Sequence, residues 1–460
     1  MDLRSKLELR GIKRTGGLES ERPTAKLGSG GRSALGLTAN EQEFKQSIFQ
    51  RLVKMLDLSL IGTLENAEAR EQIREICEAL MAEEALPFNM TVRQRIIHEI
   101  QNEILGLGPL EALLADKTVA DILVNGYDQV YVERRGKLES TNTRFDNNRH
   151  LMTIIDRIVS RVGRRIDESS PMVDARLHDG SRVNAIIPPL AIDGPLLSIR
   201  RFAVDRLTPE RMIEYGTLTA SLAEVLRAAV KGRLNIMISG GTGSGKTTML
   251  NVLSGFIPDD ERIVTIEDSA ELQLQQPHVV RLETRPANIE GKGEVTQREL
   301  VRNSLRMRPD RIVVGEVRSS EALDMLQAMN TGHDGSLTTI HANTPRDALT
   351  RVESMVAMSG VNLPTRPLRA QIASAINLVL QLERQEDGKR RLVGVQEIHG
   401  LEGDVITMSE IFRYQREGMD RDGNVLGRFT ATGIVPRFYE RLRHRGIDLG
   451  LEVFQPTAVN

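Results

Sequence analysis

The residues with the most recognisable chemistry belong to the segment "SGGTGSGKTTML", which follows an apolar run and leads into a helix-like stretch. Its spacing is Gly240-x-x-x-x-Gly245-Lys246-Thr247. At that spacing, backbone N–H groups can surround a β-phosphate, the lysine can reach the β- and γ-phosphates, and the threonine hydroxyl can ligate Mg²⁺. The segment therefore predicts a nucleotide site, with a chance match of a glycine-rich loop as the alternative. The predicted binding residues are Gly240, Gly241, Thr242, Gly243, Ser244, Gly245, Lys246, Thr247 and Thr248.

Two later apolar runs end in carboxylates, in "RIVTIEDSAEL" and "RIVVGEVR". The first places Glu267 and Asp268 at the end of a strand, and the second places Glu316 there. The carboxyl ends of parallel strands border the crevice where nucleotides bind. Glu267 or Asp268 can therefore orient an attacking water, and Glu316 can hold Mg²⁺ or polarise the nucleophile. Both acids of the first run could instead be solvated turn residues, and we expect Glu271 to begin a helix.

Two histidines, His333 and His341, flank a strand-like run in "GHDGSLTTIHANTP". Beside a phosphate site, a histidine N–H could contact the γ-phosphate or sense its loss, whereas a histidine pair taken alone is more often structural. The spacing HExxH is absent, and a single cysteine, Cys77, excludes an intrachain disulfide and a multi-cysteine zinc site. Cys77 lies on an apolar stripe, so we expect it to be buried.

The elements around these segments indicate an α/β architecture. Between residues 234 and 385, short apolar strands alternate with helices, which is typical of a parallel sheet. Asp-Gly pairs near residues 387 and 422 indicate hairpins after it. We place this domain at residues 217–460 and expect Ser221 and Glu224 to cap its first helix.

A smaller domain is predicted before it. Residues 116–204 show alternating strands joined by Asn-Gly and Asp-Gly turns, a pattern that indicates an α+β domain. Residues 205–216 are the predicted interdomain linker, in which Thr208 and Pro209 are suited to open a helix.

The first part of the chain is predicted to be helical behind a tail. Residues 39–115 carry three amphipathic helical patterns and predict a small bundle, with Thr91 and Gln94 capping the third helix. Residues 1–38 are rich in Gly, Ser, Lys and Arg and have few bulky apolar side chains. They predict a disordered, mildly basic tail.

Charge and hydropathy narrow the function classes. A formal net charge of −2 gives no global attraction to nucleic acid or to an anionic membrane. The absence of tryptophan and an aromatic content of 3% argue against base-stacking platforms, so nucleic acid is not expected as a partner. No run approaches the roughly 18 apolar residues of a membrane span, and the charged start lacks a signal-peptide pattern, so we expect a cytoplasmic chain.

The ordered set of the glycine loop, "TIED", "VVGEVR" and "GHDGSLTTIHANTP" resembles the secretion ATPase superfamily, the hexameric motors of type II and type IV secretion, type IV pili and archaella. The likeness covers roughly residues 115–440. Within the superfamily, "DILVNGYDQVYVERRGKLE", the histidine segment and "GRFTATGIVPRF" are most similar to the CpaF/TadA branch, which drives the tight-adherence (Tad, type IVc) pilus. Many type II secretion and pilus-extension relatives carry a four-cysteine zinc module, which this chain lacks. The conjugative type IV secretion branch shares the glycine- and histidine-rich box.

The resemblance implies a RecA-like P-loop ATPase core, preceded by the helical bundle and by the small α+β domain, which would be PAS-like. It implies that Glu267 is the catalytic base, that Glu316 is the Walker B glutamate, and that His333 and His341 are coupling histidines. It also implies that arginines of the small domain reach the phosphates of ATP, although each could be a solvated strand-edge charge. The candidates are Arg182 and either Arg200 or Arg201, with Arg176 as a further one.

The function that the resemblance implies is an Mg²⁺-dependent ATPase that acts as a homohexamer. It would power assembly of a Tad-type pilus, with retraction as a further capacity, through inner-membrane platform proteins. The chain would then lie in the cytoplasm and at the inner membrane through those partners. The alternatives are a type IV secretion or conjugation-type ATPase, a nucleic-acid translocase, and a nucleotide-gated assembly switch that scarcely turns over.

Overall fold

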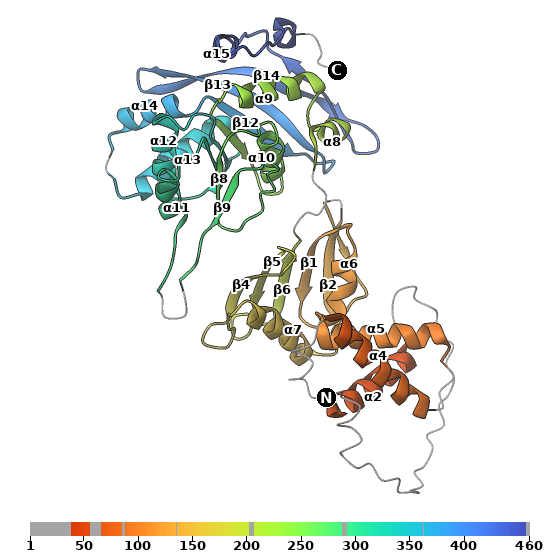
Figure 1. Cartoon of the computed structure of the whole chain (residues 1–460). Helices are drawn as coiled ribbons and strands as arrows, with labels where there is room; N and C mark the ends of the chain where they lie inside the picture. Colours follow the sequence, from red (N-terminus) through yellow and green to blue (C-terminus); the bar gives the residue numbers. More distant parts are fainter. Residues whose placement is uncertain are drawn as a thin grey trace, which may run out of the picture. The chain divides into compact units, whose positions relative to one another are not determined.

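The structure is a computed structural model that describes residues 38–55, 66–84, 88–134, 136–201, 207–287, 292–361 and 363–456. The chain forms two compact units, one ending at Gly108 and the other beginning at Pro109 (Figure 1). All but the last residue of the predicted N-terminal tail lies outside the described residues. Within the described ranges, no helix combines the length and the apolar character needed to cross a membrane.

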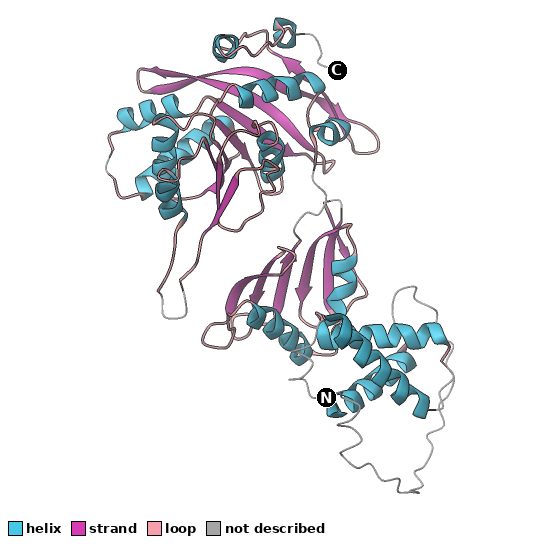
Figure 2. Cartoon of the chain, viewed as in Figure 1, coloured by secondary structure: helices cyan, strands magenta, loops and turns pink. Residues whose placement is uncertain are grey.

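The first unit is helical throughout its described part (Figure 2). Its core is formed by side chains spaced three or four residues apart on each helix, including the fully buried Cys77, as predicted. The third helix begins earlier than predicted, because the Asn89 side chain accepts the Val92 N–H and caps it, so the prediction of Thr91 as the cap was wrong. The helices are α2 (Ala39–Met55), α4 (Asn66–Glu83) and α5 (Met90–Leu105).

The second unit opens with a small α+β domain. Its six strands form an antiparallel sheet in the order β3-β2-β1-β6-β5-β4, and α7 buries one apolar face. Gly126 and Gly180 have positive φ values of 71° and 89° in the predicted turns. The elements are η1 (Gly108–Leu110), α6 (Glu111–Ala115), β1 (Val119–Asn125), β2 (Gln129–Arg134), β3 (Lys137–Ser140), α7 (Asn148–Arg161), β4 (Met172–Arg176), β5 (Arg182–Ile186) and β6 (Leu196–Arg200).

The larger domain is built on a nine-stranded mixed sheet in the order β15-β14-β13-β12-β7-β11-β10-β8-β9. The strands from β12 to β9 in that order are parallel, and β13, β14 and β15 extend the sheet as an antiparallel meander (Figure 2). The strands are β7 (Ile236–Gly240), β8 (Ile263–Glu267), β9 (Val279–Glu283), β10 (Arg311–Val317), β11 (Leu337–His341), β12 (Leu378–Arg384), β13 (Arg390–Glu402), β14 (Val405–Met419) and β15 (Val425–Ala431).

Both faces of this sheet are covered, which is why its parallel strands are continuous apolar runs. On β7, Ile236 and Ile238 join one core with α8, α9, α10 and α15, whereas Met237 joins another with α11 to α14. The helices are α8 (Pro209–Glu214), α9 (Ala220–Lys231), α10 (Lys246–Ser254), α11 (Gln297–Ser304), α12 (Glu321–Asn330), α13 (Pro345–Met358), α14 (Thr365–Ala375), α15 (Phe438–His444) and η2 (Leu451–Phe454).

Helix starts in this domain follow capping chemistry, with one predicted position in error. Thr208 caps α8 with Pro209 at its first position, as the sequence indicates. Helix α9 is capped by Thr219, whose hydroxyl accepts the Leu222 N–H. The prediction of Ser221 as the cap was therefore wrong by two residues, since both positions offer a hydroxyl near the same helix start.

Candidate nucleotide site

The glycine loop connects β7 to α10 at the carboxyl edge of the parallel strands. Gly243 and Gly245 have φ values of 69° and 93°, a conformation that disfavours other residues. A side chain at Gly240 would meet the Leu382 carbonyl oxygen at 2.5 Å. Thr247 and Thr248 lie half-buried in the first turn of α10. The loop thus has the open backbone and the helix N-terminus that an anionic phosphate needs.

Lys246 is the only charged residue of the loop and is 7% exposed. Its Nζ donates to the Gly241 carbonyl at 2.8 Å and lies 3.2 Å from His341 Nε2. Burial lowers the pKa of Lys246, and Glu316 opposes this shift. The ammonium is therefore held in a largely desolvated place, where a phosphate would be a strong partner.

His341, at the end of β11, lies between Lys246 and Glu316. Its Nε2 lies 3.3 Å from Glu316 Oε1. Burial and the charge of Lys246 lower the pKa of His341, although Glu316 opposes them. The neutral imidazole is therefore favoured, and it can accept from Lys246 or donate to Glu316.

Glu316 is also paired with an arginine that the sequence reasoning missed. Arg318 Nη2 lies 2.5 Å from Glu316 Oε2, and Arg318 Nη1 lies 3.3 Å from Asp268 Oδ2. Arg318 follows Glu316 by two residues, a spacing that places both side chains on the same face of a strand. This two-residue spacing was the signal that the sequence offered. The contact with Arg318 also places Asp268 in an ion pair.

Glu267 lies at the end of β8 with only 3% of its surface exposed. Its Oε2 accepts the backbone N–H groups of Glu271 and Leu272 at 2.7 and 2.9 Å, while its buried Oε1 has no hydrogen-bond partner. Burial raises the pKa of Glu267 to about 7, against these two hydrogen bonds. The side chain fits beside β10 because Gly315 has no Cβ, which would lie 2.9 Å from Glu267 Cγ. An oriented carboxylate with a free oxygen and a pKa near neutrality is suited to general-base chemistry.

Four of the predicted groups thus lie at the ends of adjacent strands or, for Lys246, at the start of the helix that follows β7. The sheet order β7-β11-β10-β8 brings Lys246, His341, Glu316 and Glu267 to one edge. His333 precedes β11 and lies at the opposite end of that strand, where its carbonyl accepts the Ser336 hydroxyl. The structure therefore brings one of the two histidines, and not the other, to the glycine loop of its own chain.

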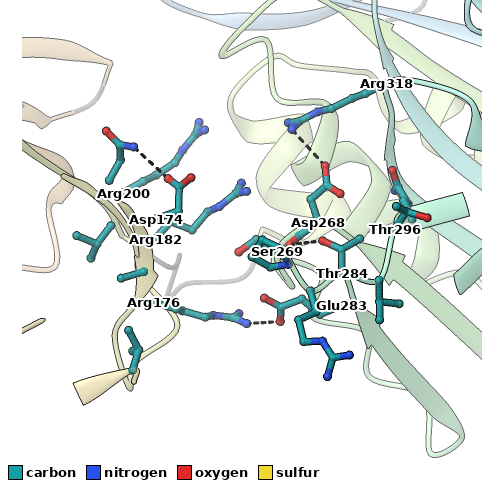
Figure 3. A pocket seen from close by; sticks show the side chains of 18 of the residues that line it. Asp174, Arg176, Arg182, Arg200, Asp268, Ser269, Glu283, Thr284, Thr296 and Arg318 are labelled. Atoms are coloured by element: carbon teal, nitrogen blue, oxygen red, sulfur yellow. Dashed lines mark hydrogen bonds and ion pairs between the residues drawn. The ribbon is translucent and has the colours of Figure 1, made fainter. Parts of the chain in front are cut away.

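Two of the candidate arginines bind acids next to β8 and β9. Arg182 Nη1 lies 2.8 Å from Glu271 Oε1, and Arg176 Nη1 lies 2.7 Å from Glu283 Oε2. Figure 3 shows Arg176 directed at Glu283 across a cleft of about 1130 Å³ that Arg182 and Asp268 also line. Glu271 begins no helix, because irregular backbone follows β8, so that prediction was wrong.

The other two candidates have different surroundings. Arg201 donates to the Asp116 and Val119 carbonyls inside the small domain. Arg200 is 63% exposed, lies 3.9 Å from Asp121, and is close enough to contribute to the lowered pKa of Lys246. Of this neighbouring pair, Arg200 is therefore the arginine whose charge acts on Lys246 of the glycine loop.

Comparison with known proteins identifies similar chains. Residues 103–426 match the family model described as "Type II/IV secretion system protein". A putative conjugal transfer protein of Mycobacterium tuberculosis is 39% identical over 312 residues, which cover 66% of this chain and 88% of that protein. Conjugal transfer protein TrbB of Rhizobium radiobacter is 34% identical over 315 residues, 67% of this chain and 91% of that protein.

Two further similar proteins are named for type IV secretion. The type IV secretion system protein VirB11 of Bartonella quintana is 31% identical over 335 residues, covering 63% of this chain and 93% of that protein. The crystal structure of the VirB11 ATPase of Brucella suis in complex with sulphate covers 63% of this chain and 92% of that chain, at 30% identity and a TM-score of 0.34.

Proposed function

The chain belongs to the type II/IV secretion system protein family, and on that premise we propose that it is an Mg²⁺-dependent ATPase that powers a type IV secretion or conjugal transfer machinery. The relatives named above, which are similar over most of their own length, carry these two functions in their names. Their names favour this function over the Tad-pilus motor that the sequence motifs indicated.

The observation that carries the proposal is the convergence of His341, Glu316 and Glu267, at the ends of adjacent strands, with Lys246 at the start of α10. The loop and Lys246 would bind the β- and γ-phosphates of ATP. Thr247 and Glu316 would hold Mg²⁺. The open loop beside Lys246 and the carboxylate of Glu316 fit that ion. When bound, Mg²⁺ neutralises charge on the transferring phosphoryl group.

Glu267 would accept a proton from the attacking water through its free Oε1. Its two backbone hydrogen bonds fix the other oxygen, so the carboxylate does not need to reorient. Such proton transfer typically contributes 10²- to 10⁴-fold to a rate, or about 3 to 5 kcal/mol of barrier.

We further propose that six copies form a ring that works on inner-membrane platform proteins. Arg200 would complete the phosphate site. Arg182 and Arg176, through their ion pairs with Glu271 and Glu283, would respond to movement of the segment after β8. An arginine that completes a phosphoryl-transfer site contributes about 10³- to 10⁵-fold to the rate.

The second candidate is a Tad-pilus motor, which the segments "GHDGSLTTIHANTP" and "GRFTATGIVPRF" favour. Both candidates share the same ATPase chemistry and differ in the machinery that receives the motion. Loss of conjugal transfer or effector secretion on deletion of the gene, with pili retained, would support the first candidate. Loss of pili with transfer retained would support the second.

The test of the enzymatic proposal compares ATP hydrolysis by the wild type, Lys246→Ala and Glu267→Ala, with Lys231→Ala as the matched control. Lys231 is the exposed last residue of α9 and should leave turnover unchanged. We expect Lys246→Ala to abolish ATP binding and Glu267→Ala to bind ATP and lose hydrolysis. Equal turnover in all four proteins would refute the ATPase proposal, and hydrolysis stimulated by DNA in a salt-dependent manner would favour a translocase.

A further inference from the structure

Two arginines stand opposite each other at the tip of the β12–β13 hairpin. Arg384 ends β12 and Arg390 begins β13, and they are direct partners in the antiparallel register. Like charges in that position repel each other unless each has another partner. The hairpin therefore keeps this pair only if both guanidinium groups are engaged elsewhere.

Arg390 is engaged with the glycine loop. Its Nε donates to the Gly243 carbonyl at 2.8 Å, and its Cδ would lie 3.2 Å from a Cβ on Gly245. The Gly243 peptide takes a positive φ of 69°, a conformation that orients loop N–H groups toward a phosphate. A charged donor on the Gly243 carbonyl stabilises that arrangement, because such hydrogen bonds are about twice as strong as neutral ones.

Arg384 connects the same hairpin to the small domain. Its Nη2 donates to the Gly136 carbonyl in the turn between β2 and β3, and its Nη1 would lie 3.6 Å from a Cβ on Gly243. Gly136 has a φ of 79° and room for the guanidinium only because it lacks a side chain. One hairpin thus contacts the glycine loop through Arg390 and the small domain through Arg384.

We propose that Arg390 and Arg384 are positioning residues, the first holding the glycine loop in its phosphate-binding form and the second transmitting the state of that loop to the small domain. The proposal rests on the proposed function, in which a nucleoside triphosphate occupies the loop. It assigns the hairpin tip, rather than the linker alone, as the connection through which nucleotide binding moves the two domains.

The charge distribution supports the proposal independently. Burial lowers the pKa of Arg390, and so does the positive charge of Arg384. Arg200 adds to this effect, while Glu133 opposes it. These cations repel one another around an open loop, and a bound polyphosphate would stabilise them. Its binding would change the electrostatic force on each arginine.

The experiment compares full-length wild type with Arg390→Gln, Arg384→Gln and the control Arg428→Gln. Arg428 lies on β15, which β14 separates from the hairpin, is 58% exposed and pairs with Glu417. Calorimetry measures the Kd for ATP with Mg²⁺, steady-state assays give kcat and KM, and amide hydrogen exchange follows residues 129–140 with and without nucleotide. Circular dichroism melting of each protein without nucleotide checks that the fold is retained.

We expect Arg390→Gln to raise Kd and KM by about ten- to a hundredfold, because one charge-assisted hydrogen bond to the loop is lost. Arg384→Gln should change Kd by less than about threefold, lower kcat, and abolish the nucleotide-dependent change in exchange at residues 129–140. The control should match the wild type in every measurement.

Two results would overturn the inference while leaving the ATPase proposal intact. One is a wild-type Kd in Arg390→Gln, and the other is a wild-type exchange response in Arg384→Gln. A wild-type protein that binds no nucleotide would instead refute the proposed function, and the inference with it.

Discussion

Replacement of Glu267 by glutamine should make the nucleotide-free protein more stable at neutral and alkaline pH. The carboxyl group is buried, and its pKa is raised from 4.5 to about 7. At ~1.4 kcal/mol per pH unit, that rise corresponds to about 3 kcal/mol of unfavourable free energy when the group is ionised in the folded state. Glutamine is never ionised, and its carbonyl oxygen can still accept the N–H groups of Glu271 and Leu272.

The sign of the effect determines the pH window. Below pH 4.5 the carboxyl group is protonated in both states, so burial has no ionisation cost. Between pH 4.5 and about 7 it ionises only in the unfolded chain, and the stability of the wild type falls relative to Glu267→Gln. Above pH 7 the difference should level off at about 3 kcal/mol.

The assay is guanidinium unfolding followed by circular dichroism, since the chain has no tryptophan for fluorescence. The free energy of unfolding is compared between the wild type and Glu267→Gln at pH 5 and pH 8. Glu417→Gln, on the exposed part of β14, is the matched control and should show no pH-dependent difference. An equal effect of Glu267→Gln at both pH values would refute the reasoning, because it would show that the carboxyl group is not held in a medium that opposes its charge.

Three further predictions concern Glu267, Arg311 and Cys77. The wild-type kcat/KM for ATP should fall about tenfold per pH unit below pH 7, because Glu267 must be deprotonated to act as a base, and a flat profile between pH 5.5 and 8 would contradict that role. Arg311→Met should destabilise the larger domain by about 3 kcal/mol in chemical unfolding, since buried Glu261 loses its bidentate partner at 2.6 and 3.1 Å and keeps only Arg233 at 3.3 Å. Cys77, whose pKa burial raises to about 12, should react with iodoacetamide at least about a thousandfold more slowly in the native protein than after unfolding, as measured by mass spectrometry.

The sequence predicted the parts of the site that are contained within one short segment. Each strand that delivers a candidate site residue is a short apolar run with a polar residue at its end, as at Glu267 and Glu316. Hydrophobic burial on both faces of the sheet dictates that pattern. The glycine loop was predictable for the same reason, because a single segment supplies the strand, the turn and the helix start. Fold class and site chemistry therefore come from segments of about ten residues each.

Contacts between segments distant in sequence could not be predicted in this way. Arg311 begins a buried strand with none of its surface exposed, and the acid that neutralises it lies 50 residues earlier. Arg390 meets the loop carbonyl of Gly243 across 147 residues, because β12 happens to lie beside β7. Sheet order decides such pairs, and no local pattern encodes it. The hairpin itself was predicted, so its two opposed arginines were a signal that something must neutralise them.

Lys246 is held by contacts that the phosphates of a nucleotide would have to replace. The Gly241 carbonyl accepts from Lys246 Nζ at 2.8 Å and from the Ser244 hydroxyl at 2.9 Å. Lys246 can therefore move to a phosphate while the Gly241 carbonyl keeps its hydrogen bond from Ser244. The free-energy cost of moving the lysine is therefore low. His341 then loses its cationic neighbour and keeps Glu316, so its preferred hydrogen bond changes from acceptor to donor. One displaced ammonium thus alters the strand end that carries the histidine segment, which is how a change at the γ-phosphate can reach the rest of the domain.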